Sequence, residues 1–336
     1  MNHNLVLDDF CHKNVLLFRR IFSSLVITFL LIANNLAVAD QTFKIGLATW
    51  GGYPESVRGF KKGLEEAGLI EGKNLTFLTG GAVTDQKNRQ QIVNSFIEAK
   101  VDLVYSLTTG GTVVVKELIP KTTPIVFSIV TYPADSGLIE SFEYSGNNLV
   151  GTSNYVPTLQ YLKLLKLIIP SVKTIAIFHR KDEPNSKIQT ANILRLLKRE
   201  GIKGIDREPE NIEQVRLMAM ELVGQVDAFM TTTDTLMQSG GEQVLIDVSL
   251  NSNIPILSSN KLGIEQGSSF GPVADFYILG QMAGAKAAKI LLEGAEPTKI
   301  QTELQEPPLF LVNRASLDKL GIKLSPEAQK LIKWVN

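Results

Sequence analysis

The sequence predicts an α/β protein made of two doubly wound parallel-sheet lobes joined by a hinge. Short apolar runs rich in strand-forming residues alternate with segments of helical periodicity along most of the chain. Runs such as 124–130 (PIVFSIV) and 174–178 (TIAIF) are almost wholly apolar, which is typical of strands covered by helices on both faces. The alternation breaks near residues 150–158 and then restarts, which indicates two similar lobes.

The first lobe is expected to open with a strand at 43–49 (FKIGLAT), followed by a helix at 54–69 whose apolar residues recur at helical spacing. The same alternation predicts further strands at 74–78, 102–108 and 124–130 and helices at 85–99 and 112–118. The segment 146–154 is rich in glycine, asparagine and hydroxyl residues, and we expect it to cross between the lobes.

The second lobe is expected to start with a helix after this crossing. Its predicted helices lie at 157–169, 185–200 and 238–251, and its predicted strands at 173–178, 227–231 and 254–258. A single continuous doubly wound sheet is the alternative. Between two lobes, the carboxyl ends of the strands face a shared cleft, which is where open α/β sheets bind ligands.

The N-terminal region predicts a signal peptide that is cleaved after Ala39. Arg19 and Arg20 precede an apolar run at 21–32, and the small residues of Ala37-Val38-Ala39 suit a signal peptidase. The alternative is a retained membrane anchor, but a spanning helix needs about 20 apolar residues and asparagines interrupt this run. The only cysteine is Cys11, so the mature chain is expected to lack disulfides and a lipid attachment site.

Composition narrows the possible functions of the exported part. The chain has 34 basic and 34 acidic residues, so nothing favours nucleic acid or anionic lipid as a partner. After cleavage only His179 remains of three histidines, and phosphate-loop, dinucleotide and nucleophile-elbow motifs are absent. We therefore expect no metal, no cofactor and no catalytic site. His179 is expected to be solvated or to line the cleft, and Glu208 and Glu210 to be solvated.

Hydrogen-bonding residues follow several predicted strands and are candidates for binding a ligand. The turn from Thr109 to Thr112 offers backbone N–H groups for a carboxylate, or simply caps a helix. Asp234 suits an ammonium group, with helix capping as the alternative, and Trp50 suits a ring, with packing at a lobe edge as the alternative. The expected ligand-binding set is Thr49, Trp50, Thr108, Thr109, Gly110, Gly111, Thr131, Tyr132, Asn185, Ser186, Thr233, Asp234 and Asp275.

Two linked segments, 123–138 (TPIVFSIVTYPADSGL) and 145–153 (SGNNLVGTS), resemble a paired block of one known family. This is the ABC transporter substrate-binding family that includes tryptophan- and tyrosine-binding lipoproteins. The order and spacing of the segments make the resemblance specific, and it spans residues 42–324. Supporting segments are 68–75 (GLIEGKNL), 109–113, 233–235, 267–280, 311–315 (LVNRA) and 320–322 (LGI).

The resemblance implies a type I periplasmic-binding fold, in which three crossovers hinge the lobes and a ligand is trapped as they close. On this basis we expect residues 40–154 and about 276–300 to form lobe I, and 155–275 and about 301–336 to form lobe II. The chain departs from the family at Tyr132, where aspartate is usual, and at Thr235-Leu236, where Asn-Thr usually follows the aspartate. The first departure removes an acid and bears on which ligand is bound.

We therefore expect the periplasmic solute-binding component of an ABC importer, a monomer that delivers a small polar or amphipathic, amino-acid-like ligand to a membrane permease. Thr108 to Gly111 are expected to hold carboxylate or carbonyl groups, Asp234 a cationic or hydroxyl group, and Trp50 with Tyr132 an apolar or ring portion. One alternative is a periplasmic receptor that docks to a membrane signalling protein. A more remote one is an exported α/β enzyme.

Overall fold

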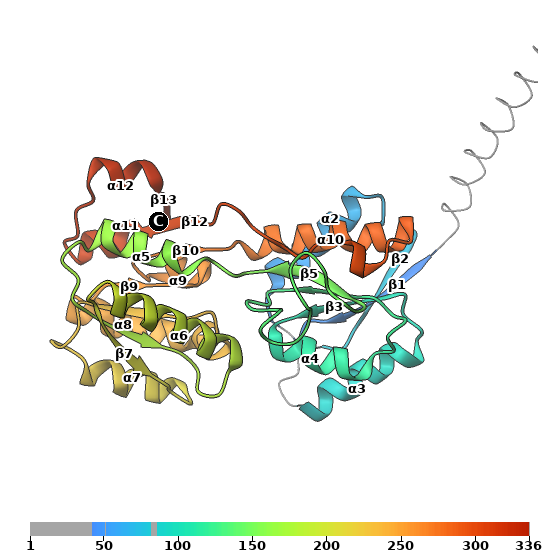
Figure 1. The fold of residues 1–336 in the computed structure, drawn as a ribbon, viewed down its shortest axis with the longest axis horizontal. Helices are drawn as coiled ribbons and strands as arrows, with labels where there is room; N and C mark the ends of the chain where they lie inside the picture. Colours follow the sequence, from blue (N-terminus) through green and yellow to red (C-terminus); the bar gives the residue numbers. More distant parts are fainter. Residues whose placement is uncertain (1–41, 51, 82–85, 336) are drawn as a thin grey trace, which may run out of the picture.

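The computed structural model describes residues 42–50, 52–81 and 86–335, which form two α/β lobes lying side by side (Figure 1). The predicted signal peptide lies outside the described residues. Within those three ranges, no helix is both long enough and apolar enough to cross a membrane.

The first lobe is built on a six-stranded sheet in the order β11-β5-β4-β3-β1-β2, and all of its pairings are parallel. Helices α2 and α10 pack on one face and α3 and α4 on the other, each face with its own apolar core. The elements are β1 (Phe43–Ala48), α2 (Pro54–Glu66), β2 (Leu75–Thr79), α3 (Gln86–Glu98), β3 (Leu103–Leu107), α4 (Thr109–Leu118), β4 (Ile125–Ser128), β5 (Leu149–Ser153), α10 (Phe276–Glu293), the 3-10 helix η2 (Pro297–Lys299) and β11 (Glu303–Leu304).

The second lobe is built on a seven-stranded sheet in the order β13-β12-β10-β9-β8-β6-β7. It is parallel except that β12 runs antiparallel to β10. Helices α5 and α6 bury one face, and α7 and α8 bury the other. The elements are α5 (Thr158–Ile168), β6 (Thr174–Phe178), α6 (Pro184–Arg199), β7 (Lys203–Arg207), α7 (Ile212–Glu221), β8 (Ala228–Thr231), the π-helix η1 (Met237–Gly241), α8 (Glu242–Ser252), β9 (Ile256–Leu257), α9 (Lys261–Gln266), β10 (Phe270–Val273), β12 (Leu309–Asn313), α11 (Arg314–Lys319), α12 (Pro326–Leu331) and β13 (Lys333–Val335).

Three connections join the lobes, and the predicted class of two doubly wound lobes is confirmed. They run from β5 to α5, from β10 to α10 and from β11 to β12. We expected the third crossing near residue 300. Because Glu303 and Leu304 pair with Thr152 and Ser153 of β5, the chain leaves the first lobe only after Leu304.

Close packing of α2 against α10 ties the start of the described chain to a helix more than two hundred residues later. A Cβ atom on Gly59 would collide with the carbonyl oxygen of Tyr277, and one on Gly280 would collide with that of Ser56. Gly63 and Gly284 repeat this contact one turn along, so each helix presents a Gly-x-x-x-Gly face to the other. Only glycine lets the two backbones approach this closely.

Between residues 43 and 258 two parts of the structure differ from the predicted elements, and the elements after residue 258 were not predicted. Helix α4 begins at Thr109 rather than Thr112, because the side chain of Thr108 caps the helix three residues earlier. The strand β7 and the helix α7 were not predicted. The sequence of β7 is KGIDR, an edge strand that is only partly buried, so it lacks the apolar run by which the other strands were found.

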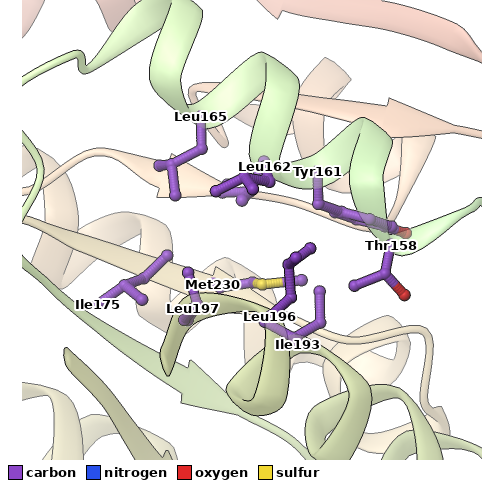
Figure 2. Close-up of a pocket in the computed structure, with 10 residues that line it drawn as sticks. Thr158, Tyr161, Leu162, Leu165, Ile175, Ile193, Leu196, Leu197 and Met230 are labelled. Carbon is purple, nitrogen blue, oxygen red and sulfur yellow. The ribbon is translucent and has the colours of Figure 1, made fainter. Parts of the chain in front are cut away.

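A small apolar cavity lies in the core of the second lobe between α5 and α6 (Figure 2). Its volume is about 10 Å³, and its lining includes Tyr161, Leu162, Ile193 and Leu196. A space of this size holds at most one water molecule, so it is a packing defect and not a ligand site.

Candidate functional site

A cleft of about 730 Å³ lies between the lobes, with walls from both of them and from the hinge. Lobe I contributes the residues that follow β1 and β3 together with one side chain of α3. Lobe II contributes Arg180 after β6, the turn and helices that follow β8, and α9. Its lining includes Thr49, Trp50, Tyr53, Glu55, Arg89, Thr108, Arg180, Thr235, Glu242, Asn260, Lys261, Glu265, Asp275 and Phe276.

Trp50 forms the wall of lobe I and is fixed from two sides. Its Nε1 donates to the carbonyl oxygen of Leu107 at 3.1 Å. A Cβ atom at position 111 would collide with the indole, so the ring packs directly on Gly111 in the first turn of α4. The guanidinium of Arg89 lies 5.2 Å from the centre of the ring, within cation–π distance. The cleft therefore has a rigid aromatic surface with a cation beside it.

Thr108 holds an unusual backbone conformation at the start of α4. Its φ of 66° and ψ of 157° lie outside the regions that residues with a Cβ normally adopt. The side-chain oxygen accepts a hydrogen bond from the N–H of Gly111 at 3.2 Å, which supports the strained residue. Such conformations persist where the surrounding structure enforces them, and they concentrate at binding sites.

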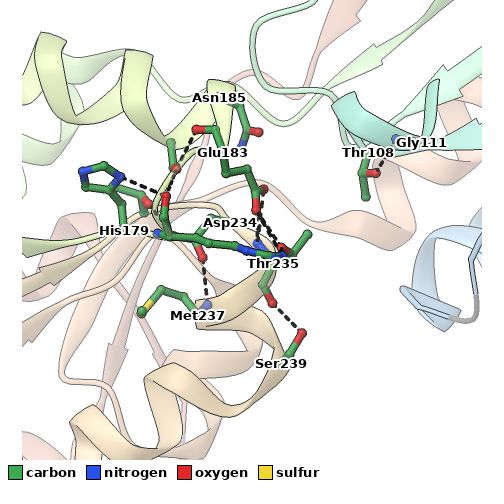
Figure 3. Close-up of polar contacts among 12 residues, drawn as sticks. Thr108, Gly111, His179, Glu183, Asn185, Asp234, Thr235, Met237 and Ser239 are labelled. Carbon is green, nitrogen blue, oxygen red and sulfur yellow. Dashed lines mark hydrogen bonds and ion pairs between the residues drawn. The ribbon is translucent and has the colours of Figure 1, made fainter. Parts of the chain in front are cut away.

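Asp234 lies behind the wall of lobe II, where it is 1% exposed. Its carboxylate accepts hydrogen bonds from the N–H of Met237 at 2.8 Å, the hydroxyl of Thr232 at 2.8 Å and the N–H of Arg180 at 3.1 Å (Figure 3). Burial, with the nearby charge of Glu183, raises the pKa of this carboxyl to about 6 despite these donors. Asp234 thus braces two strand ends and keeps a partly uncompensated negative charge.

Glu183 places a second carboxylate close to Asp234. It accepts hydrogen bonds from the N–H of Thr235 at 3.2 Å and from the hydroxyl of Thr235 at 2.6 Å, and it lies 3.9 Å from the guanidinium of Arg180. Tyr53 of lobe I faces this group across the cleft. Its pKa is raised by burial and then by the charges of Glu183 and Asp234, so the hydroxyl stays protonated and can donate.

Asp275 joins the cleft to the hinge. Its carboxylate accepts from Lys261 of α9 at 2.8 Å and from the N–H of Tyr277, which caps α10. The N–H of Asp275 donates to the side chain of Gln305 at 2.6 Å. Two of the three crossovers therefore meet at one residue that also lines the cleft.

The structure separates the predicted binding residues into groups. Thr49, Trp50, Thr108 and Asp275 line the cleft. Thr109 and Gly111 are buried behind Trp50, and Gly110 is exposed. Thr131 donates to Asn154 Oδ1 at 3.1 Å, and Tyr132 stacks obliquely near Tyr155. The remaining predicted residues lie together behind the wall of lobe II, where they hydrogen-bond the strand-end loops: Asn185, Ser186, Thr233 and Asp234.

Several cleft residues were not predicted, namely Tyr53, Arg89, Arg180, Asn260, Lys261 and Phe276. Asn260 follows β9 and its side-chain nitrogen donates to Glu242 at 2.7 Å. Its side-chain oxygen is buried and has no hydrogen-bond partner within the described ranges, so it can accept from a ligand. Arg180 and Asn260 each follow a strand, β6 and β9, so the position that the other candidate residues share would have found them. Arg89 lies on α3, where no such rule applies.

One expectation about an ionisable group is wrong. His179 neither contacts solvent nor lines the cleft, since it is 1% exposed and its Nε2 lies 2.9 Å from Asp206 Oδ1. Glu208 is exposed, as expected, and its carboxylate also lies 3.5 Å from the same nitrogen. The periodicity of β6 did not reveal this because the partners come from β7, which was not predicted.

Comparison with known proteins identifies the family. Residues 51–333 match the model of the family described as ABC transporter substrate binding protein. A tyrosine-binding protein of Clostridioides difficile is 29% identical over 277 residues, covering 82% of this chain and 79% of that protein.

Two solved structures share the fold. One is an ABC domain from Streptococcus pneumonia in complex with L-Trp, with a TM-score of 0.79, 23% identity and coverage of 88% of this chain and 100% of that one. The other is the ligand-free, open form of a substrate binding protein with adhesive properties from Clostridium difficile, with a TM-score of 0.71, 26% identity and coverage of 88% and 99%. With its two hinged lobes and the matched family model, this chain belongs to the ABC transporter substrate-binding protein family.

Proposed function

We propose that the protein captures a small amino-acid-like solute in the cleft and hands it to an ABC importer. The observation that carries this proposal is the cleft of about 730 Å³, which both lobes and the hinge line. A solute bound there contacts both lobes at once, so its binding favours the closed arrangement over the open one. The same residues offer no acid–base pair around a nucleophile, and the proposal is a receptor without catalysis.

The lining of the cleft favours a zwitterion that also has a ring or apolar portion. Trp50, Tyr53 and Phe276 supply aromatic surface. Cationic and anionic side chains both reach the cleft, so a carboxylate and an ammonium each find a partner there. The cations are Arg89, Arg180 and Lys261, and the anions are Glu55, Glu265 and Asp275. The names of a tyrosine-binding relative and of a complex with L-Trp support aromatic amino acids as the first candidates.

Asp234 is proposed to act on the ligand indirectly and not by direct contact. Its carboxylate is already occupied by three donors behind the wall, so we infer that it acts through the electrostatic potential of the cleft and the position of Arg180. Glu183 adds to that negative potential. The proposal also includes export by the signal peptide at 1–39, action as a monomer in the periplasm, and a membrane permease as the partner.

A thermal-shift panel tests the ligand class. Tag-free protein is melted with each amino acid and with sugars, nucleosides and small organic acids as the contrasting classes. A ligand at 100 times its Kd stabilises the folded state by about 2.7 kcal/mol, which shifts the melting temperature measurably. We expect an aromatic amino acid to give the largest shift.

A matched pair of variants locates the binding. Trp50→Ala removes the aromatic wall of the cleft, and Tyr144→Ala removes an aromatic side chain that is 50% exposed and does not line the cleft. The ligand-induced shift should be lost in the first variant and kept in the second. A shift from sugars alone, or equal shifts in both variants, would contradict the proposal.

A further inference from the structure

His179 has no role in the proposed function and lies in a cluster of three side chains that could bind a metal ion. His179 follows β6 at the carboxyl end of the strand, beside Asp234 (Figure 3). In the register of the sheet Ile177 pairs with Asp206 of β7, so the next positions on the same face are His179 and Glu208. One imidazole nitrogen and one oxygen of each carboxylate all lie within 4.8 Å of one another.

Both nitrogens of the ring face only acceptors. Nδ1 lies 3.3 Å from the carbonyl oxygen of Arg180, while Nε2 lies 2.9 Å from Asp206 Oδ1 and 3.5 Å from Glu208 Oε1. A carbonyl cannot donate, so a hydrogen bond at Nδ1 requires the proton on that nitrogen. With Nδ1 protonated, Nε2 meets the two carboxylates either as a second N–H, which makes the ring an imidazolium, or as a lone pair that binds a metal cation.

We propose that His179, Asp206 and Glu208 form a binding site for one divalent transition-metal ion of the zinc class. Imidazole nitrogen and carboxylate oxygen are both zinc ligands, and zinc sites with three protein ligands take solvent at the remaining position. Zinc–ligand distances of about 2.1 Å in a tetrahedron place the donor atoms about 3.4 Å apart. The separations of 2.9 and 3.5 Å from Nε2 bracket this value.

The surroundings of the cluster also suit a metal. The hydrogen bond from Nδ1 to a backbone carbonyl fixes the ring and leaves Nε2 as the ligand atom, an arrangement that is common for metal-binding histidines. The imidazole is 1% exposed, whereas each carboxylate side chain is 43% exposed, so an ion can enter from solvent. We expected no metal site because one histidine remains, but one histidine is enough when two carboxylates face it.

Titration calorimetry with ZnCl₂ tests the site. The protein is prepared without a polyhistidine tag, stripped with EDTA and titrated at about pH 7.5. We expect saturable binding of one ion per chain, reversed by EDTA. Loss of a partner outside the metal ligands already weakens metal sites by about 10- to 100-fold, so Asp206→Asn and Glu208→Gln should each weaken binding by at least about tenfold. The variants replace exposed side chains, so they leave the core intact.

The matched control is Glu210→Gln, which removes an exposed carboxylate two residues away that pairs with Lys181. It should bind zinc like the natural chain. The ion needs the free lone pair of Nε2, so a proton competes with it for that nitrogen. Binding should therefore weaken by about tenfold or more at pH 5.5 and release protons, measured by repeating the titration in buffers of different ionisation enthalpy.

Equal zinc affinity in the natural chain and in both carboxylate variants, or the absence of saturable binding, would overturn the proposal and leave His179 as an ion pair that holds β7 to β6. An effect of Glu210→Gln equal to that of Glu208→Gln would also overturn it, because it would indicate nonspecific attraction to acidic groups.

Discussion

The absence of a side chain at Gly111 sets the position of Trp50, which forms the aromatic wall of the cleft. Gly111 has no side chain, so the indole of Trp50 packs on its backbone while Nε1 reaches the carbonyl oxygen of Leu107. The neighbouring Gly110 has open space around its Cα. From the sequence the two glycines looked equivalent, as parts of a turn that leaves backbone N–H groups free. The structure assigns them different roles because the contact with Trp50 is long-range in sequence.

This difference predicts opposite effects for two adjacent substitutions. Gly111→Ala should displace Trp50 and destabilise the protein by about 1–3 kcal/mol, as overpacked cores do. Gly110→Ala adds the same methyl group in the first turn of α4 without a collision, and it should be neutral or stabilise the protein by up to about 1 kcal/mol. Urea unfolding measures both. A stable Gly111→Ala protein with unchanged tryptophan fluorescence would refute the packing described for Trp50.

The carboxyl of Asp234 should make the stability of the folded protein depend on pH. Its pKa rises to about 6 in the folded state, above the ordinary value of 3.8. The folded protein therefore binds the proton more tightly than the unfolded chain does. The stability contribution of this group is fully present below about pH 4 and is lost as the pH rises through about 6, by on the order of 3 kcal/mol.

The measurement is the free energy of unfolding of the natural chain and of Asp234→Asn at a series of pH values. The variant has no titrating group at this position, so the difference between the two curves should change between about pH 4 and 7, with the natural chain losing stability relative to the variant. A difference that is constant over this range would show that the carboxyl titrates normally.

At the scale of elements, the sequence predicted buried strands of lobe I and the centre of lobe II but missed the exposed edge strand β7. Buried strands such as β3, β4 and β6 are apolar runs, so their period and length are visible. The edge strand β7 is partly exposed and mostly polar, so it was missed together with α7, and the partners of His179 were missed with it. Some candidate residues that follow predicted strands line the cleft, such as Thr49 and Thr108, but cleft residues on helices, such as Arg89, give no local signal.

Because α2 and α10 pack backbone against backbone, one added methyl group between them should destabilise the protein strongly. Gly280→Ala would place a methyl group against the backbone of α2, and separating the helices should cost about 1–3 kcal/mol or more. In an exposed helix the same substitution would stabilise by about 0.5–1 kcal/mol, so helix propensity cannot explain a loss. Denaturant unfolding with Gly110→Ala as the reference measures the effect. Equal stability of the two variants would mean that α2 and α10 pack less closely than described.

At the scale of the whole molecule, the two lobes have the same α/β architecture but supply different groups to the cleft. Lobe I supplies a rigid aromatic and strained wall from Trp50 and Thr108, and lobe II supplies charges from Arg180 and Lys261. Asp275 connects the charged wall to two crossovers, so contacts made by a solute act directly on the hinge. The sequence indicated the two lobes and the direction of their cleft, but the distances across it depend on how the lobes are placed, which no local pattern encodes.

The central claim is that this cleft captures an amino-acid-like solute, and calorimetric titration with L-tyrosine, with the other amino acids titrated in parallel, tests it most directly. The account predicts saturable binding of one aromatic amino acid per chain in the micromolar range, on the order of −8 kcal/mol, and loss of that binding in Trp50→Ala. Absence of saturable binding to every amino acid, or binding that Trp50→Ala leaves unchanged, would contradict it.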